Sequence, residues 1–343
     1  EYIEYCSSHH AFNKGMTVHG THNTRVEGNV VYENLGHSYF LEDGGEEGNQ
    51  FLGNLAINAR KPVSRDAATE RDDFNNPSSF WMENGLNIHR DNHAAGSEGA
   101  GFFFDLRGLN GLSRSRQYRA NYQENREGPT DFQGNSSHSN RNQAFFLNHA
   151  GYVRSEAYKG TDAHPQVVAE DWEVNGFTAY KSRLGLYIRG IGGNFFNVMM
   201  GEIDEGTRFR LNQAISHALI VGRTNNIGDP SSSLWDASEG RTMPYDGEFV
   251  GHQLYDGPGG LNHVHFAGFP SGSDDHPIKE SNAVHKSSLH YVNRLSFAAD
   301  IPFSQRMRHS NPLVEARGIV DIDGSLSGVP GAALIGQLRR NNE

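Results

Sequence analysis

The sequence predicts an all-β protein, a right-handed parallel β-helix (solenoid) with projecting loops. The first observation is a repeated unit: VEGN at 26–29 returns as FLGN at 51–54 and as HRDN at 89–92. Each unit joins an apolar strand, a Gly corner, a polar arm and an Asn turn, and repeats of roughly 20–50 residues are typical of solenoids. The second observation is that no long stretch carries apolar residues at helical spacing. The content of Gly 40 with 36% hydrophobic residues also fits coils with tight corners and wet outer faces.

Apolar segments mark the expected strands in order along the chain. The first coils occupy 1–58, and the pattern resumes with FWM after Ser79 and with GFFFDL at 101–106. Later strands are expected in the segments 132–151, 172–180, 184–190, 195–201, 218–225, 254–269 and 314–328.

A solenoid can grow without a domain boundary, so residues 1–343 are predicted to form one parallel β-helix domain. Polar segments near 59–78, 107–130, 152–170 and 226–248 interrupt the pattern and are predicted to project as loops. Insertions that leave a solenoid at one corner often form the wall of a binding groove. Because the sequence begins without Met inside a running coil, we expect it to be part of a longer or processed protein.

Composition argues against several classes of function. The net charge is −11, whereas a nucleic-acid-binding protein would normally carry a basic excess, so no nucleic-acid partner is expected. No apolar run approaches the roughly 18 residues of a membrane span, and no membrane span is predicted in this chain. Cys6 is the single cysteine, so no intrachain disulfide can form.

The corners of the first three units carry chemically active side chains. When VHG, EDG and ENG are aligned, His19, Asp43 and Asn84 fall at one position, with Glu42 and Glu83 one position earlier. Successive coils stack roughly 4.8 Å apart, so such residues would form a row along the solenoid. Neighbouring positions of a strand point to opposite faces, so only one of the two rows can face a groove.

Carboxyl and imidazole groups in such a row have the parts for general acid–base catalysis, and they could also hold a divalent cation. The catalytic candidates are Asp43, Glu42, Glu47, His19 and His37. The substrate-binding candidates are His22, Asn84, His93, Glu98 and Trp81. We expect Asp43 with Glu42 or Glu47 as the acid–base pair, and histidines that orient the substrate or donate protons.

A purely structural interpretation stands beside this one. Asn and Asp side chains stabilise solenoid corners by hydrogen bonds to the backbone, and Asn29, Asn54 and Asn92 are predicted to have only this role. FWM and GFFFDL are predicted to lie mainly in the core. Trp81 would stack on a sugar ring only if it faced the groove.

Several segments resemble one known family. GHSYFLEDGGEEGN, FWM and AAGSE, followed far downstream by DGPGGLNHVHFAGF and IVDIDGSLSGVPG, resemble the β-helix region of the cell-migration-inducing hyaluronidase and fibrocystin-like family. The resemblance covers nearly the whole chain and is densest over 5–104. It implies an extracellular or cell-surface location. Two members of that family are linked to hyaluronan depolymerisation, one with calcium dependence, whereas fibrocystin is not known as an enzyme.

Two functions therefore follow as hypotheses. The first is a polysaccharide hydrolase that acts on a linear, hyaluronan-like glycan laid along a groove, with a lyase as its variant. The second is a non-catalytic structural or adhesive solenoid that binds glycan or associates end to end into filaments, because open solenoid ends expose strand edges. No cofactor is required by the sequence, and Ca²⁺ is the one that the resemblance suggests.

Overall fold

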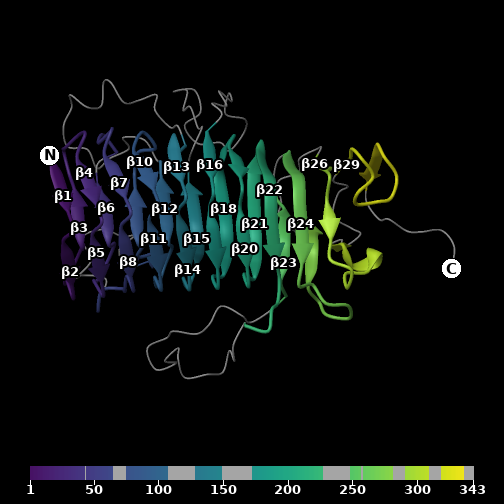
Figure 1. Cartoon of the computed structure of the whole chain (residues 1–343), viewed down its shortest axis with the longest axis horizontal. Coiled ribbons are helices and arrows are strands. Elements are labelled where there is room, and N and C mark those ends of the chain that lie inside the picture. Colours follow the sequence, from purple (N-terminus) through teal and green to yellow (C-terminus); the bar gives the residue numbers. More distant parts are fainter. Residues whose placement is uncertain are drawn as a thin grey trace.

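The computed structural model describes residues 1–42, 44–64, 75–106, 128–148, 172–226, 248–255, 258–280, 290–308 and 318–335. These residues form a parallel β-helix, as predicted, whose coils follow one another from the N-terminal to the C-terminal end (Figure 1). The central parts of the four predicted loops lie outside the described residues. The assignment of residues 1–343 to one domain stays a prediction.

The strands belong to two sheets, and most coils contribute two strands to the larger sheet and one to the smaller. The smaller sheet, here called sheet B, has 10 strands. They are β3 (Met16–Val18), β6 (Tyr39–Leu41), β9 (Phe80–Met82), β12 (Phe102–Asp105), β15 (Gln143–Asn148), β18 (Leu184–Ile191), β21 (Glu205–Leu211), β23 (Val250–Leu254), β25 (His276–Glu280) and β28 (Met307–Arg308).

The larger sheet, sheet A, has 20 strands. Those of the first half are β1 (Tyr2–Glu4), β2 (Ser7–His9), β4 (Arg25–Glu27), β5 (Val30–Tyr32), β7 (Gln50–Leu52), β8 (Leu55–Ile57), β10 (Ile88–Arg90), β11 (His93–Ala95), β13 (Asp131–Gln133) and β14 (Ser136–His138). Those of the second half are β16 (Glu173–Asn175), β17 (Thr178–Tyr180), β19 (Asn194–Phe196), β20 (Met199–Gly201), β22 (Gln213–Val221), β24 (Gly259–Ala267), β26 (His290–Asn293), β27 (Ser296–Phe297), β29 (Gly318–Asp321) and β30 (Ala332–Ile335).

An asparagine ladder forms the corner between the two sheet A strands of each early coil. Gly28 and Gly53 adopt positive φ, of 61° and 58°, and so turn the chain sharply just before the asparagine. The side-chain amide of Asn29 donates to Asn54 Oδ1 over 3.0 Å, and Asn54 donates in the same way to Asn92. Each oxygen also accepts the backbone N–H of the asparagine one coil earlier. The hydrogen bonding predicted for these corner asparagines is confirmed.

Later coils close the same corner with apolar side chains. Parallel pairing of β13, β16 and β19 carries the corner position from Asn135 to Phe177 and Val198. Phe177 and Val198 are fully buried. The corner is therefore held by hydrogen bonds in the first coils and by apolar packing in the following ones.

The interior of the solenoid is filled by side chains that alternate along each strand. Tyr39, Phe80 and Phe102 form one inward row of sheet B, with ring centroids 4.7 and 4.6 Å apart. The Tyr39 hydroxyl donates to the backbone carbonyl of Asn29 over 2.8 Å and so links this row to the asparagine ladder. Stacked rings at coil spacing add attraction beyond their apolar burial, so the interior resists a change of register.

The C-terminal end departs from the parallel pattern. A short 3₁₀ helix, η4 (Phe303–Gln305), precedes β28, and β30 pairs with β29 in antiparallel fashion. Asp321 Oδ2 accepts the backbone N–H groups of Leu326 and Ser327, which fixes a turn beyond β29.

Candidate functional site

The outward face of sheet B carries a row of aromatic rings. Phe40, Trp81, Phe103 and Phe146 occupy equivalent positions of β6, β9, β12 and β15 and form a hydrophobic cluster separate from the interior core. Trp81 lies 4.5 Å from Phe103, and Phe103 lies 4.4 Å from Phe146, between ring centroids. Tyr187 on β18 continues the row, stacked on Phe146 at 5.0 Å. The rings are buried from Phe40 to Phe146, and Tyr187 is half-buried.

A polar row runs beside these rings, in a register that differs from the predicted one. Pairing aligns Val18, Leu41 and Met82, the last residues of three successive strands. The residues that follow them form the polar row, and they are His19, Glu42 and Glu83. His19 Nδ1 lies 3.1 Å from Glu42 Oε2.

The predicted alignment of His19 with Asn84 is therefore wrong by one position. The corner glycines mislead because Gly20 is the second residue after Val18, whereas Gly44 and Gly85 are the third residues after Leu41 and Met82. Asp43 lies outside the described residues.

The polar row continues through three further residues that the sequence analysis missed. Asp105 follows Glu83 by one coil, and pairing then aligns Asp105 with Asn148 and Asn148 with Arg189. The Asn148 amide donates to Asp105 Oδ1 over 3.2 Å. Asn148 Oδ1 is buried and accepts no hydrogen bond. Arg189 is exposed.

Beyond Tyr187 the aromatic row becomes cationic. Arg208 on β21 contacts the Tyr187 ring on one side and the Tyr255 ring on the other, 5.3 and 5.4 Å from their centroids. Its guanidinium also donates to both carboxylate oxygens of Glu205 and to Gln253. Burial raises the pKa of Glu205, although the positive charge of Arg208 opposes that shift.

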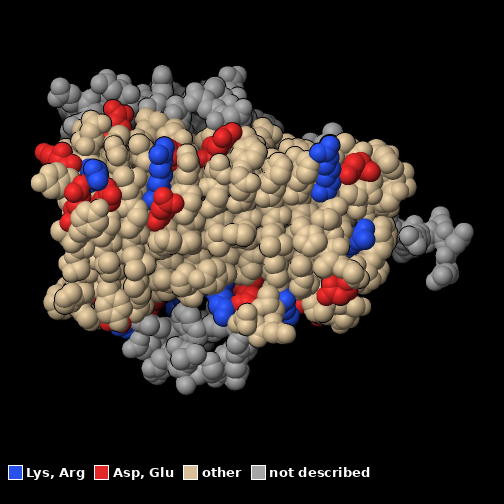
Figure 2. Space-filling model, viewed as in Figure 1, with Lys and Arg blue, Asp and Glu red and all other residues tan. Residues whose placement is uncertain are grey.

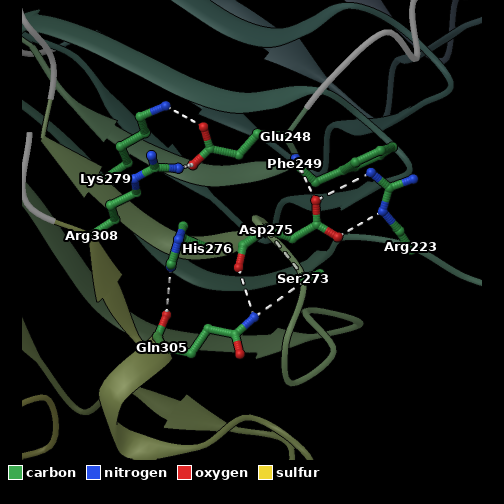
Figure 3. A network of polar contacts seen from close by, with 9 residues as sticks. All are labelled: Arg223, Glu248, Phe249, Ser273, Asp275, His276, Lys279, Gln305 and Arg308. Carbon is green, nitrogen blue, oxygen red and sulfur yellow. Dashed lines mark hydrogen bonds and ion pairs between the residues drawn. The ribbon is translucent and has the colours of Figure 1, made fainter.

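The last strands of sheet B continue this cationic stretch. Lys279 and Arg308 both form ion pairs with the single carboxylate of Glu248, as Figure 3 shows. Two cations therefore share one anion at this end of the sheet.

A second network in Figure 3 is structural. The buried Asp275 carboxylate accepts two hydrogen bonds from Arg223, at 2.7 and 3.3 Å, and one from the backbone N–H of Phe249. The Gln305 amide donates to the backbone carbonyl of Asp275 over 2.9 Å. This network joins the segments before β23 and β25 to η4.

Two of the predicted residues, His37 and Trp81, lie in the buried part of this face. The His37 ring lies 4.3 Å from the Trp81 ring, and His37 Nδ1 accepts the backbone N–H of Ser78 over 3.0 Å. Trp81 is only 1% exposed, and its indole N–H donates to Glu83 over 3.3 Å. Stacking of Trp81 on a sugar is therefore not supported, and its contact with Glu83 links it to the polar row.

Three more of the predicted site residues, Asn84, His22 and Glu47, lie in the corner that follows the polar row. Asn84 is buried, donates to the backbone carbonyl of Gly44 and accepts the N–H of Leu86 at 2.7 Å. These contacts are those of a corner-forming asparagine. His22 Nδ1 accepts the backbone N–H of Glu47 over 3.2 Å, which brings these two candidates together. The carboxylate of Glu47 is exposed.

His93 and Glu98 do not join the polar row. His93 points outward from β11 in sheet A, where its Nδ1 lies 2.6 Å from Ser136 Oγ. Glu98 Oε2 accepts the backbone N–H of Lys61 over 2.6 Å at the corner that precedes β12. Figure 2 has the same view as Figure 1. It shows a broad belt without Lys, Arg, Asp or Glu along the middle of the face turned toward the reader.

The described residues do not fit a resident metal ion. Within them, no group of three or more His, Cys, Asp and Glu side chains is arranged to hold one. The DIDG segment, which could suggest calcium, instead uses Asp321 and Asp323 to accept turn hydrogen bonds. Nor does the described part of the chain contain a helix long and apolar enough to cross a membrane.

Comparison with known proteins gives a consistent result. Residues 1–145 match the family model described as CEMIP beta-helix. The mouse cell migration-inducing and hyaluronan-binding protein is 27% identical over 97% of this chain, and the human cell surface hyaluronidase CEMIP2 is 26% identical over 75%. Mouse fibrocystin-L is 36% identical over 31% of this chain and 2% of its own length.

The chain spans 29% of the mouse hyaluronan-binding protein and 22% of the human cell surface hyaluronidase. The family model and the long matches agree with the parallel pairing of the strands in both sheets. The match of residues 1–145 to the CEMIP beta-helix model and the long matches to these relatives confirm the resemblance predicted from the sequence.

Proposed function

We propose that this chain binds and depolymerises a hyaluronan-like linear glycan along the outward face of sheet B. The observation that carries the proposal is the polar row, in which Glu42, Glu83 and Asp105 come from three successive coils beside a continuous aromatic row. Carboxyl groups at coil spacing are the parts that glycoside hydrolysis requires.

The relatives' names support the substrate class. Two of them are named as a hyaluronan-binding protein and a cell surface hyaluronidase. Both names describe much longer proteins, so the glycan, its hydrolysis and an extracellular or cell-surface location enter here as proposals for this chain.

In the proposed reaction, one carboxyl of the polar row protonates the glycosidic oxygen and a second acts as nucleophile or base. Backbone positions in neighbouring coils lie about 4.8 Å apart. Retaining glycosidases hold their carboxyl groups about 5 Å apart, so Glu83 and Asp105 are the favoured pair and retention of configuration is expected.

Each member of this pair has a neighbour that can orient it. Trp81 donates to Glu83, and Asn148 donates to Asp105. His19 and Glu42 would contact the next sugar along the row. Asp43 directly follows Glu42 in sequence and stays a candidate acid. No step of this mechanism uses calcium.

The test is the size distribution of hyaluronan, chondroitin and a neutral glycan after incubation with the protein, with calcium and with chelator. We expect shortening of an acidic polymer by the wild type and its loss in Glu83→Gln and Asp105→Asn. Glu173→Gln, at an exposed carboxyl on sheet A, is the matched control and should retain activity. Shortening that survives both substitutions would reject the assigned pair.

A lyase is the variant of this proposal, in which a base removes the C5 proton of a uronate. Its products carry a new double bond, so their ultraviolet absorbance would distinguish it from hydrolysis. Glu83→Gln and Asp105→Asn should lose activity in this case too, because the uronate would also lie on the outward face of sheet B.

A non-catalytic scaffold is the second candidate function. It is favoured by exposed apolar side chains on strands of sheet A, where Tyr32, Tyr180 and Met199 are 40%, 39% and 53% exposed. Apolar side chains exposed on a sheet favour contacts between molecules. Concentration-dependent oligomers in sedimentation experiments, without shortening of any polymer, would favour this candidate.

A further inference from the structure

We propose that the outward face of sheet A carries a binding site for an aromatic side chain of a partner protein. The site, here called the Gly201 gap, lies over Gly201 of β20, between the side chains of Tyr180 and Val221. It belongs to a different sheet from the polar row, so the inference goes beyond the proposed function and does not depend on it.

The Gly201 gap interrupts a column of side chains that stand at coil spacing. Pairing places Tyr180 beside His138 on one side and beside Gly201 on the other, and it places Gly201 beside Val221. Because Gly201 has no side chain, Tyr180 and Val221 are separated by two coils, or roughly 10 Å. Carbon atoms in contact lie about 3.5–4 Å apart, so one flat ring fits between the two side chains.

The gap is open, and one of its walls is held in place. Among the described residues, a Cβ added at Gly201 would come within 4 Å only of Val221 Cβ, at 3.9 Å. The Tyr180 ring stacks on the His138 ring with 4.5 Å between centroids and 6° between planes. Tyr180 is nevertheless 39% exposed. The stack on His138 therefore fixes the orientation of the Tyr180 ring and leaves its other face available toward the gap.

Two other glycines of sheet A and its corners show what fills a gap of this kind. Gly260 pairs with Tyr291, and the Tyr291 ring lies where a side chain of Gly260 would project. At Gly28 the ring of Tyr5 does the same, with Cε1 2.6 Å from the position of a Cβ. In both places a phenol ring from the neighbouring coil covers the glycine. The described residues supply no such ring to Gly201, so the matching occupant is an aromatic ring from outside the chain.

The remaining surroundings select an uncharged, apolar ring. Met199, two residues before Gly201 on the same face of β20, is 53% exposed, and its neighbour Leu219 is 37% exposed. A thioether makes favourable contacts with the edge of an aromatic ring. Lys181, in the adjoining corner, is already paired with Glu202. A sugar would need hydrogen-bond partners around its hydroxyl groups, which Met199 and Leu219 do not supply, so an aromatic side chain is favoured over a sugar.

The test uses p-fluorophenol, which has the ring of a tyrosine side chain, and follows its binding by fluorine NMR titration. The wild type should bind it at one saturable site. Tyr180→Ala removes the stacking wall, and Gly201→Val fills the gap with a side chain. Each should weaken binding about tenfold, because a stacking contact and its apolar burial are lost. Tyr180→Phe should retain binding, since the ring remains.

Tyr32→Ala is the matched control and should leave binding unchanged. Tyr32 is a similarly exposed tyrosine of the same column, but its neighbour Ile57 has a side chain. Thermal unfolding separates loss of the site from misfolding. Gly201→Val should raise the melting temperature, because a glycine weakens a strand and a Cβ has space at this position. A loss of binding in a more stable variant cannot come from a damaged fold.

The protein partner is tested with a phage-displayed library of random peptides, selected on the wild type and depleted on Gly201→Val. The selected peptides should share a Phe, Tyr or Trp and should compete with p-fluorophenol. Peptides without a common aromatic residue would reject the inference. So would absence of saturable p-fluorophenol binding, or an equal loss of binding in Tyr32→Ala and Tyr180→Ala. Binding of methyl glucoside that depends on Tyr180 would identify a sugar site instead.

Discussion

The two halves of the outward face of sheet B share one backbone pattern but carry opposite charge. From β3 to β12 the polar row holds His19, Glu42, Glu83 and Asp105, whereas on β18 and β21 it holds Arg189 and Arg210. Parallel pairing sets the spacing of both halves. The comparison teaches that the solenoid supplies a regular frame, on which side-chain identity alone makes one half acidic and the other basic.

The largest expected effect is on the rate of glycan shortening, and it should differ between Asp105 in the acidic half and Glu205 in the basic half. Asp105→Asn should lower the rate of glycan shortening by about 10²–10⁴-fold, the usual contribution of a general acid or base. Glu205→Gln should have a much smaller effect, because Glu205 is engaged by Arg208. Initial rates on one hyaluronan preparation decide between them. A greater loss in Glu205→Gln would move the catalytic site to the basic half.

The next effect concerns the aromatic row, which is buried in the acidic half and half-open in the basic half. Trp81→Ala should lower the free energy of unfolding by about 3–5 kcal/mol, as for other buried large-to-small changes. Tyr187→Ala should cost less, roughly 1 kcal/mol. Urea titration of both variants measures the difference. Equal losses of unfolding free energy in the two variants would show that the greater burial of Trp81 does not contribute to stability.

The corners offer a third contrast. Asn54→Ala removes the acceptor of Asn29 and the donor to Asn92, and it leaves buried polar groups unsatisfied. We expect a loss of about 3 kcal/mol in the free energy of unfolding, roughly 1–3 kcal/mol for each buried group left without a partner. Asn175→Ala, which removes one exposed contact with Asn197, is the control and should cost far less. Similar losses in the two variants would argue against the ladder as a stabilising element.

The last expected effect is a pH dependence common to both halves. Burial lowers the pKa of His89, in the early coils, and of His252, in the later coils, to about 3. In the unfolded chain both would titrate near 6.5. Their contribution to stability is therefore present above pH 6.5 and is lost as the pH falls from 6.5 towards 3, by about 1.4 kcal/mol per pH unit for each histidine.

Urea titrations between pH 7 and pH 5 measure this slope. His89→Phe should flatten it by the share of one histidine, because Phe occupies the equivalent position on both neighbouring strands, at Phe51 and Phe132. An unchanged slope in that variant would contradict the assignment.

Much of the fold could be predicted because its signals are periodic and local. The glycine–asparagine corners at Asn29 and Asn54 recur with a spacing of 25 residues, which fixes both the coil and its register. By contrast, the corner at Phe177 could not be recognised as the same feature, since an apolar residue there looks like any core residue.

The candidate site was only partly predictable, for a related reason. Glu42 and His19 lie in the two most regular units, so their row could be located to within one position. Asp105, Asn148 and Arg189 belong to coils separated by insertions of unequal length, and no repeat signal links them. The pairing of Arg189 with Arg210 also depends on a bulge, which the residue pattern does not reveal.

The most direct test is a crystal structure of Asp105→Asn with a bound hyaluronan oligosaccharide. We predict that the sugar lies on the outward face of sheet B, with a glycosidic oxygen near Glu83 and residue 105. A sugar bound instead to the outward face of sheet A would contradict the central claim.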